Sequence, residues 1–253
     1  MAKDVTKIGS TVVSQATSNF LKRVTAHAAV LEQTKIGFGF DATASRDPTW
    51  RAAIPMQADL LDMFAKLDEI PPLVRLACFG GGQGGTRAEY KATEWMSDVP
   101  ALTQWMRGIM CQGGTTQIEK MLEDVVRQAE QGKMAMFVYI GDCIELAGTF
   151  SISGGTDRES EIYRHARRLG ELNVPVYLFQ EGDDRTAHRV FAQVAQLSGG
   201  YHAAFKAGAF KEMGDYAKVA VAKATGSRKA LAALRDDAAL TAGARLMLEY
   251  KPK

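Results

Sequence analysis

The chain has 253 residues, of which 46% are hydrophobic and 24% are charged. This is the ordinary composition of a folded globular protein, and it excludes a largely disordered chain. The 31 basic and 29 acidic residues leave a net charge of +2. Domains that bind nucleic acid usually carry a marked excess of basic residues, so we expect no nucleic-acid partner.

The cysteines and the N-terminal segment indicate the compartment. Cys78, Cys111 and Cys143 are widely spaced and odd in number, which is not the pattern of a disulfide framework and favours a reducing environment. The first residues lack the apolar core of a signal peptide, and no stretch reaches the ~18 apolar residues of a membrane span. We therefore expect a cytoplasmic protein with no membrane partner.

The first third of the chain predicts a helix and then a strand–helix–strand unit. Apolar residues recur at helical spacing from Val12 to Ala28, which predicts an amphipathic helix within residues 1–33. Lys35 to Asp41 is an apolar run that ends in a charge, and it predicts a buried strand. Pro48 begins a predicted helix that extends to Leu67, and Leu73 to Phe79 is a second predicted strand.

The rest of the chain continues this alternation. Further strands are predicted at residues 87–96, 133–140, 174–179 and 201–205. Further helices are predicted at residues 99–109, 118–131, 159–172, 186–197, 210–221, 228–234 and 240–250. The pattern predicts an α/β fold: a doubly wound, mostly parallel sheet with helices on both faces, one antiparallel edge strand and extra terminal helices. We divide the chain into an N-terminal helical extension (1–33), a central domain (34–225) and a C-terminal helical extension (226–253).

Ligands of such sheets bind at the carboxyl ends of the strands. This rule selects Asp41, Cys78, Asp142, Gln180 and Glu181 before any motif is considered.

Three stretches at these predicted ends carry oxygen donors. Asp41 is followed by the hydroxyls of Thr43 and Ser45; Thr115 and Thr116 follow the glycine turn at 113–114 and open a helix; and Asp142 follows the most apolar strand. Carboxylates and hydroxyls without histidine suit a hard cation, above all Mg²⁺, with Mn²⁺ or Ca²⁺ as alternatives. So few charged ligands would leave the ion able to accept an acidic group from outside.

These three stretches resemble the metal-ion-dependent adhesion site (MIDAS) of the von Willebrand factor A family. The family motif is Asp-x-Ser-x-Ser, then a distant Thr, then a distant Asp; here the first stretch is Asp-Ala-Thr-Ala-Ser, with Thr43 in place of the first serine. Thr116, two residues before Ile118, matches the second motif better than Thr115 does, and Cys143 stands where a glycine often follows the last aspartate. The resemblance covers residues 34 to 225.

The resemblance implies a Rossmann-like fold and a metal bound by Asp41, Thr43, Ser45, Thr116 and Asp142, with no catalytic residues. It also implies a partner protein whose acidic side chain completes the coordination. Intracellular relatives that consist of this domain alone often work in stress-response systems or large assemblies.

Simpler interpretations stand beside these. Asp41, Thr43 and Ser45 could cap a following helix. The five glycines within 80–85 lack the ending of a phosphate-binding loop and favour a hairpin connection. The cysteines are expected as small packing residues, the four histidines as surface or packing residues, and Glu181 as part of an exposed acidic turn.

Two other functions remain open. A phosphohydrolase of the haloacid dehalogenase type would use Asp41 as nucleophile, but it needs a second aspartate where this chain has Thr43. A structural domain with a vestigial site would fold normally and bind no metal.

Overall fold

A computed structural model describes residues 33–47, 50, 72–80, 89–111, 116–132, 134–144, 157–206 and 209–251. The chain divides into two units, Met1–Gln33 and Thr34–Lys253, and the fold below is that of the second. The helices predicted within residues 1–33 and from Pro48 to Leu67, and the glycines at 81–85, lie outside the described residues, except for the buried Trp50.

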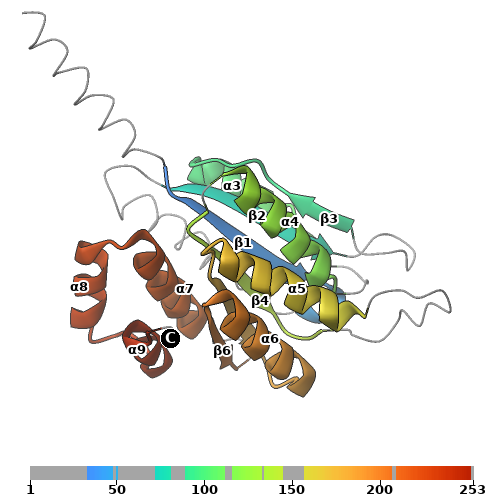
Figure 1. The fold of residues 1–253 in the computed structure, drawn as a ribbon. Helices are drawn as coiled ribbons and strands as arrows, with labels where there is room; N and C mark the ends of the chain where they lie inside the picture. The colour runs from blue at the N-terminus through green and yellow to red at the C-terminus, as the bar shows by residue number, and fades with distance from the viewer. Residues whose placement is uncertain are drawn as a thin grey trace, which may run out of the picture. The chain divides into compact units, whose positions relative to one another are not determined.

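The second unit is built on a six-stranded sheet with the order β3-β2-β1-β4-β5-β6 (Figure 1). The strands are β1 (Lys35–Ala42), β2 (Leu73–Gly80), β3 (Glu89–Ala92), β4 (Met136–Gly141), β5 (Val176–Glu181) and β6 (Tyr201–Phe205). All neighbouring pairs are parallel except β2 and β3, so β3 is an antiparallel edge strand. The predicted fold class is confirmed.

The helices follow the predicted order. They are the short 3₁₀ helix η1 (Ala44–Arg46), α3 (Val99–Arg107), α4 (Ile118–Gln131), α5 (Arg158–Glu171), α6 (Arg185–Ser198), α7 (Phe210–Thr225), α8 (Arg228–Asp236) and α9 (Ala242–Glu249). Gly199 ends α6 with a φ of 75°, a left-handed conformation that glycine adopts without steric cost. Among the described residues, no helix is long and apolar enough to cross a lipid bilayer.

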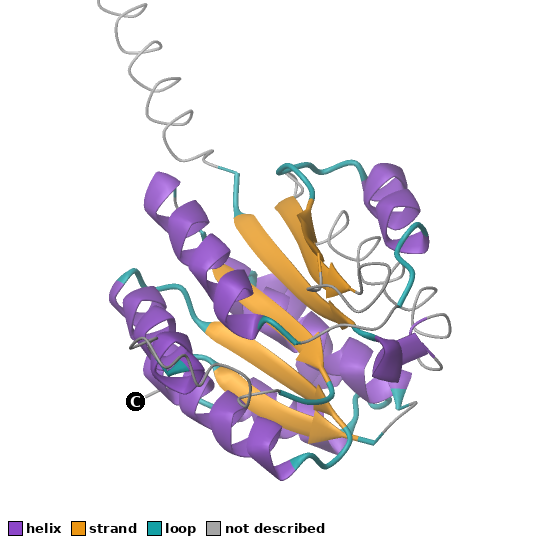
Figure 2. Cartoon of the chain, turned by 90° about the vertical axis from the view of Figure 1, so that its right-hand side faces the viewer, coloured by secondary structure: helices purple, strands orange, loops and turns teal. Residues whose placement is uncertain are grey.

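Helices cover both faces of the sheet, as Figure 2 shows. Successive strand residues point to opposite faces, so the sheet separates two cores, and β2, β4 and β5 contribute side chains to both. One core joins Phe38, Phe40 and Val138 to α3, α7 and α9. The other core joins Phe79 and Tyr139 to α4, α5 and α6. At about 25 cal/mol per Å² of apolar surface, these two cores are the main source of the fold's stability.

Gly39 in β1 allows α4 to approach the sheet closely, and Gly37 leaves room for the Phe137 ring of β4. A Cβ atom on Gly39 would lie 2.3 Å from the Met121 sulfur and 2.6 Å from the Phe137 ring, and a Cβ atom on Gly37 would lie 2.7 Å from the same ring. The first turn of α4, which contains Met121, therefore rests directly against the β1 backbone. This contact brings the segment before α4 to the carboxyl end of β1.

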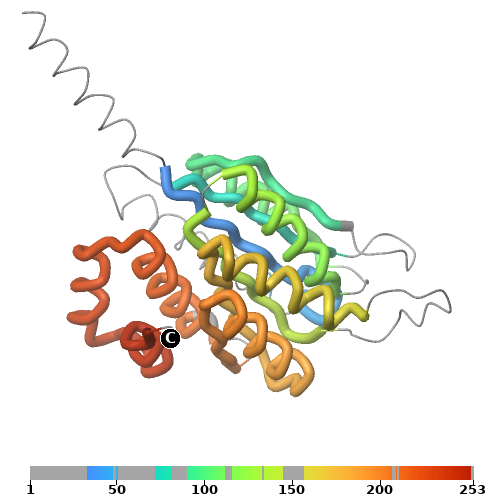
Figure 3. The backbone as a smooth tube through the Cα atoms, viewed as in Figure 1, coloured from blue at the N-terminus to red at the C-terminus, as the bar shows by residue number. Residues whose placement is uncertain are grey.

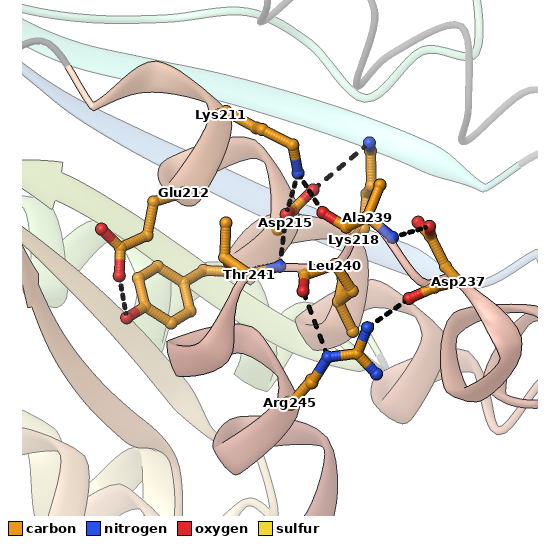
Figure 4. A network of polar contacts seen from close by, with 10 residues as sticks. Lys211, Glu212, Asp215, Lys218, Asp237, Ala239, Leu240, Thr241 and Arg245 are labelled. Atoms are coloured by element: carbon orange, nitrogen blue, oxygen red, sulfur yellow. Dashed lines mark hydrogen bonds and ion pairs between the residues drawn. The ribbon is translucent and has the colours of Figure 1, made fainter.

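The C-terminal helices fold back on α7 (Figure 3). Asp215, which is 3% exposed, accepts hydrogen bonds from Lys211 Nζ at 2.8 Å and from the backbone N–H of Thr241 at 3.0 Å (Figure 4). Met247 on α9 is fully buried in the first core, whereas its neighbour Leu246 is exposed. The C-terminal segment therefore packs on the core.

Candidate metal centre

The centre of the candidate site is Asp41 in β1. Phe38 and Phe40 face the first core, so alternation along the strand turns Asp41 to the opposite face, where Gly37 and Gly39 leave space. The Asp41 side chain is fully buried. A buried carboxylate requires hydrogen bonds or a cation to offset the loss of its hydration.

Asp41 receives one hydrogen bond from its own loop and one from the segment before α4. The backbone N–H of Thr43 donates to Oδ1 at 2.8 Å, and the Thr116 hydroxyl donates to Oδ2 at 3.2 Å. The Thr43 hydroxyl lies 3.1 Å from the Ser45 hydroxyl. Within the described residues it makes no capping bond to η1, so Thr43 does not act as a side-chain helix cap.

Asp142 and Cys143 follow β4, and their side chains lie close to the Asp41 carboxylate. A carboxylate oxygen of Asp41, one of Asp142 and the Cys143 sulfur all lie within 4.8 Å of one another. The Thr116 hydroxyl is 3.9 Å from the Cys143 sulfur. Oδ1 of Asp142 is buried and has no hydrogen-bond partner among the described residues. Four of the predicted site residues thus come together: Asp41, Thr43, Thr116 and Asp142. Ser45 is exposed and contacts the group through the Thr43 hydroxyl. Thr115 lies outside the described residues.

The electrostatics of this cluster favour a cation. The pKa of Asp41 is raised to about 6: burial is the main cause, hydrogen bonding to Thr43 acts against it, and the charge of Asp142 adds to it. The pKa of Cys143 is likewise raised to about 12, mainly by burial and then by the negative charges of Asp142 and Asp41. Two carboxylates and a thiol that are drawn together in a partly dry site are stabilised by a positive charge between them.

Tyr139 lies beside this cluster and was not expected from the sequence. Its side chain is fully buried, and its ring meets the Phe191 ring edge to face with 5.4 Å between the ring centroids. Its hydroxyl has no hydrogen-bond partner among the described residues. A Cβ atom on Gly141 would lie 2.5 Å from that hydroxyl, so the glycine makes room for the phenol. Burial, and then the charge of Asp41, raises the pKa of Tyr139 well above its usual value.

Arg46 and Glu181 correct the expectation of an exposed acidic turn after β5. Glu181 is 5% exposed and forms an ion pair with Arg46, which is 2% exposed and belongs to η1. β5 continues two residues beyond the predicted Phe179, so Glu181 is part of the strand and not of the turn. The pair ties the loop that carries Thr43 and Ser45 to the end of β5.

Among the described residues, the histidines and the other cysteines are not part of this cluster. His188 and His202 pack ring against ring at 4.7 Å, although their spacing in the sequence does not predict a pair. Cys78 is buried in the first core and Cys111 packs partly against it, which agrees with their expected role as packing residues.

No family model matches this sequence, and no curated protein matches it. Solved structures match it in fold. The human COPII-coat protein Sec24c is 10% identical over 76% of this chain and 32% of its own, with a TM-score of 0.54. Proximal thread matrix protein 1 from the mussel byssus is 16% identical over 75% of this chain and 46% of its own, with a TM-score of 0.53. A structure of the mussel protein with a zinc-occupied MIDAS motif gives a TM-score of 0.50 at 16% identity, covering 75% of this chain and 47% of that one.

The sheet order, the antiparallel edge strand and these matches define an α/β domain of the Rossmann-like class. More narrowly, the chain has the von Willebrand factor A fold, as its resemblance to that family implies. It spans about a third of the Sec24c chain and less than half of the mussel protein.

Proposed function

We propose that this domain is a non-enzymatic binding module that holds one divalent cation and recruits an acidic side chain of a partner protein to it. The ligands would be Asp41, Thr43, Ser45, Thr116 and Asp142, with the carboxylates acting partly through water. The observation that carries the proposal is the convergence of Asp41, Thr116 and Asp142 from three separate segments on one point, where Asp41 and Thr116 are buried and Asp142 is half-buried.

The donor chemistry and one solved structure support a cation at this point. The oxygen donors alone would favour Mg²⁺, with Mn²⁺ or Ca²⁺ as substitutes. The buried Asp142 oxygen without a hydrogen-bond partner among the described residues is a further argument for an ion. The mussel protein that shares the fold holds zinc in its MIDAS motif. Cys78, Cys111 and Cys143 form no disulfide, which supports a reducing compartment such as the cytoplasm.

Titration calorimetry with Mg²⁺, Mn²⁺ and Zn²⁺ tests metal binding. We expect at least one of these cations to bind with a stoichiometry of one, and Asp41→Ala to abolish that binding. Asp183→Ala is the matched control, because Asp183 is an exposed aspartate just beyond β5 and outside the cluster. Binding of no cation, or equal binding by the Asp41→Ala variant, would contradict the proposal.

The partner's role is tested by capture from cell lysate with the cation and with a chelator present. We expect a protein that is retained only with the cation, and not by the Asp41→Ala variant. Alanine replacement of the partner's acidic residues should then remove its binding at a single position. Turnover of a phosphomonoester that Asp41→Asn abolishes would instead favour the phosphohydrolase alternative.

A further inference from the structure

Cys143 differs from the other two cysteines in its surroundings. Cys78 is 2% exposed and lies among apolar side chains, and Cys111 packs at the margin of the same core. The groups near the Cys143 sulfur are polar: carboxylate oxygens of Asp41 and Asp142 lie within 4.8 Å, and the Thr116 hydroxyl lies at 3.9 Å. A cysteine that serves only as a small hydrophobe would not be expected among these groups.

The distances within this cluster are similar to or slightly longer than those between ligands of one cation. With zinc–oxygen bonds of about 2.0–2.2 Å and a zinc–sulfur bond of about 2.3 Å, tetrahedral ligands lie roughly 3.3–3.7 Å apart. The Thr116 hydroxyl is 3.2 Å from Asp41 Oδ2 and 3.9 Å from the Cys143 sulfur. The widest separation allowed among Asp41, Asp142 and Cys143 is 4.8 Å, so shifts of about 1 Å or less close the set around an ion.

We propose that Cys143 is itself a ligand, and that its sulfur makes this a site for a thiophilic divalent cation, Zn²⁺ in preference to Mg²⁺. This inference rests on the proposed function, because it concerns the same site. Thiolate is a soft ligand that favours zinc and related ions, whereas Mg²⁺ binds oxygen almost exclusively. Two carboxylates and one thiolate supply the charge, and the Thr116 hydroxyl can complete a four-coordinate set. An acidic group from a partner would then enter as a fifth ligand or in place of that neutral hydroxyl.

Binding would exchange a proton for the metal. The S–H bond of Cys143 breaks, a metal–sulfur bond forms, and the proton passes to solvent, with no change in oxidation state. A carboxylate that is ionised beforehand binds the ion without releasing a further proton.

Co²⁺ is a suitable probe, because a cobalt–thiolate bond gives an intense near-ultraviolet charge-transfer band that oxygen ligands do not give. The full-length reduced protein is titrated with Co²⁺, and the bound Co²⁺ is then displaced by Zn²⁺ or Mg²⁺. We expect the band to saturate at one equivalent of Co²⁺ and to be absent in Cys143→Ser. Zn²⁺ should displace the bound Co²⁺ at far lower concentration than Mg²⁺ does. The matched control is Cys111→Ser, which should keep the band. Asp41→Ala should also lack the charge-transfer band. That result would show that the Cys143 sulfur and the Asp41 carboxylate bind the same ion.

Affinities separate this inference from the proposed function. In Cys143→Ser we expect Zn²⁺ affinity to fall by at least about 10- to 100-fold, while Mn²⁺ affinity changes by less than about threefold, since Mn²⁺ favours the oxygen ligands that remain. If the wild-type protein binds Mn²⁺ through Asp41 but gives no charge-transfer band with Co²⁺, the thiolate ligand is refuted and the proposed function stands. If no cation binds, both are refuted.

Discussion

The Thr116 hydroxyl donates a hydrogen bond to Asp41 Oδ2 at 3.2 Å across 75 residues of sequence. Thr116 precedes α4, and α4 lies close to β1 because Gly39 has no side chain to separate them. The pairing of the two site residues is therefore a consequence of how one helix packs on one strand.

Replacing Thr116 tests this relationship. Thr116→Val keeps the shape but removes the hydroxyl, so we expect metal affinity to fall by at least about tenfold. The free energy of unfolding should fall by about 1 kcal/mol, since a buried Asp41 oxygen loses a hydrogen bond. Thr116→Ser should retain most of both. Calorimetry measures the affinity and urea denaturation measures the stability. Thr115→Val, made in parallel, should change the metal affinity little. If Thr115→Val weakened binding more than Thr116→Val did, Thr115 would be the ligand.

Asp124 in α4 is expected to be important for stability rather than for binding. It is 4% exposed and accepts hydrogen bonds from Arg75 at 2.8 Å and from Tyr90 at 2.5 Å, so it joins α4 to β2 and β3. Burial raises the pKa of Asp124, but the hydrogen bonds from Tyr90 and Arg75 outweigh it and keep the pKa below its usual value.

Asp124→Asn should lower the free energy of unfolding by about 2–3 kcal/mol, because it leaves the half-buried Arg75 guanidinium without its counterion. Glu161→Gln, which removes the half-buried acid of a helix pair whose arginine, Arg164, is exposed, should cost less than about 1 kcal/mol. Urea denaturation at neutral pH compares the two. Equal losses of stability in the two variants would show that the contacts of Asp124 with Arg75 and Tyr90 contribute no more than a surface ion pair.

Gly141→Ala should disturb the site through Tyr139. The added methyl group would lie 2.5 Å from the phenol oxygen and 2.8 Å from the ring, so the ring must move within a packed core. We expect a loss of about 1–3 kcal/mol in stability and weaker metal binding. Adding Tyr139→Phe, which removes the oxygen, should recover part of the loss. Gly108→Ala is the control: the closest atom to its Cβ would be 3.4 Å away, so its stability should change by less than about 1 kcal/mol.

His202 should make stability depend on pH. Burial and then the neighbouring His188 lower the pKa of His202 to about 4, compared with about 6.5 in the unfolded chain. Between these values the unfolded chain binds a proton that the folded chain does not, so stability falls as the pH falls below about 6.5 and levels off near pH 4. Because the ring is partly accessible, we expect a loss of about 1–2 kcal/mol.

The measurement is urea denaturation of the wild-type protein and His202→Gln at pH 7.5 and pH 5. The variant should lose less stability over this range than the wild-type protein, since its amide does not titrate. Parallel losses would exclude His202 as the source.

The sequence predicts the architecture and most of the candidate site for local reasons. The strand from Lys35 and the strand that ends before Asp142 are apolar runs closed by a charge, and parallel strands bring such ends to one edge of a sheet. The buried position of Tyr139 could not be predicted, because it depends on the register that sets Gly141 at the end of β4, next to β1. The polar surroundings of Cys143 depend equally on the close contact of α4 with β1.

Glu181 was misplaced for a related reason. The apolar run of β5 ends at Phe179, and the two polar residues after it gave no indication that the strand continues. The burial of Glu181 depends on Arg46, which is 135 positions earlier in the chain, and a pairing over that distance cannot be derived from local pattern.

The ion pair of Arg46 and Glu181 has a consequence for how ligands arrive. To shift the segment from Thr43 to Arg46, the molecule would have to separate opposite charges in surroundings that water hardly reaches, which is strongly unfavourable. The segment is therefore already ordered before any ion or carboxylate approaches. Association would then involve little further loss of backbone entropy, so the rate of encounter would be limited by diffusion and orientation rather than by rearrangement of the loop.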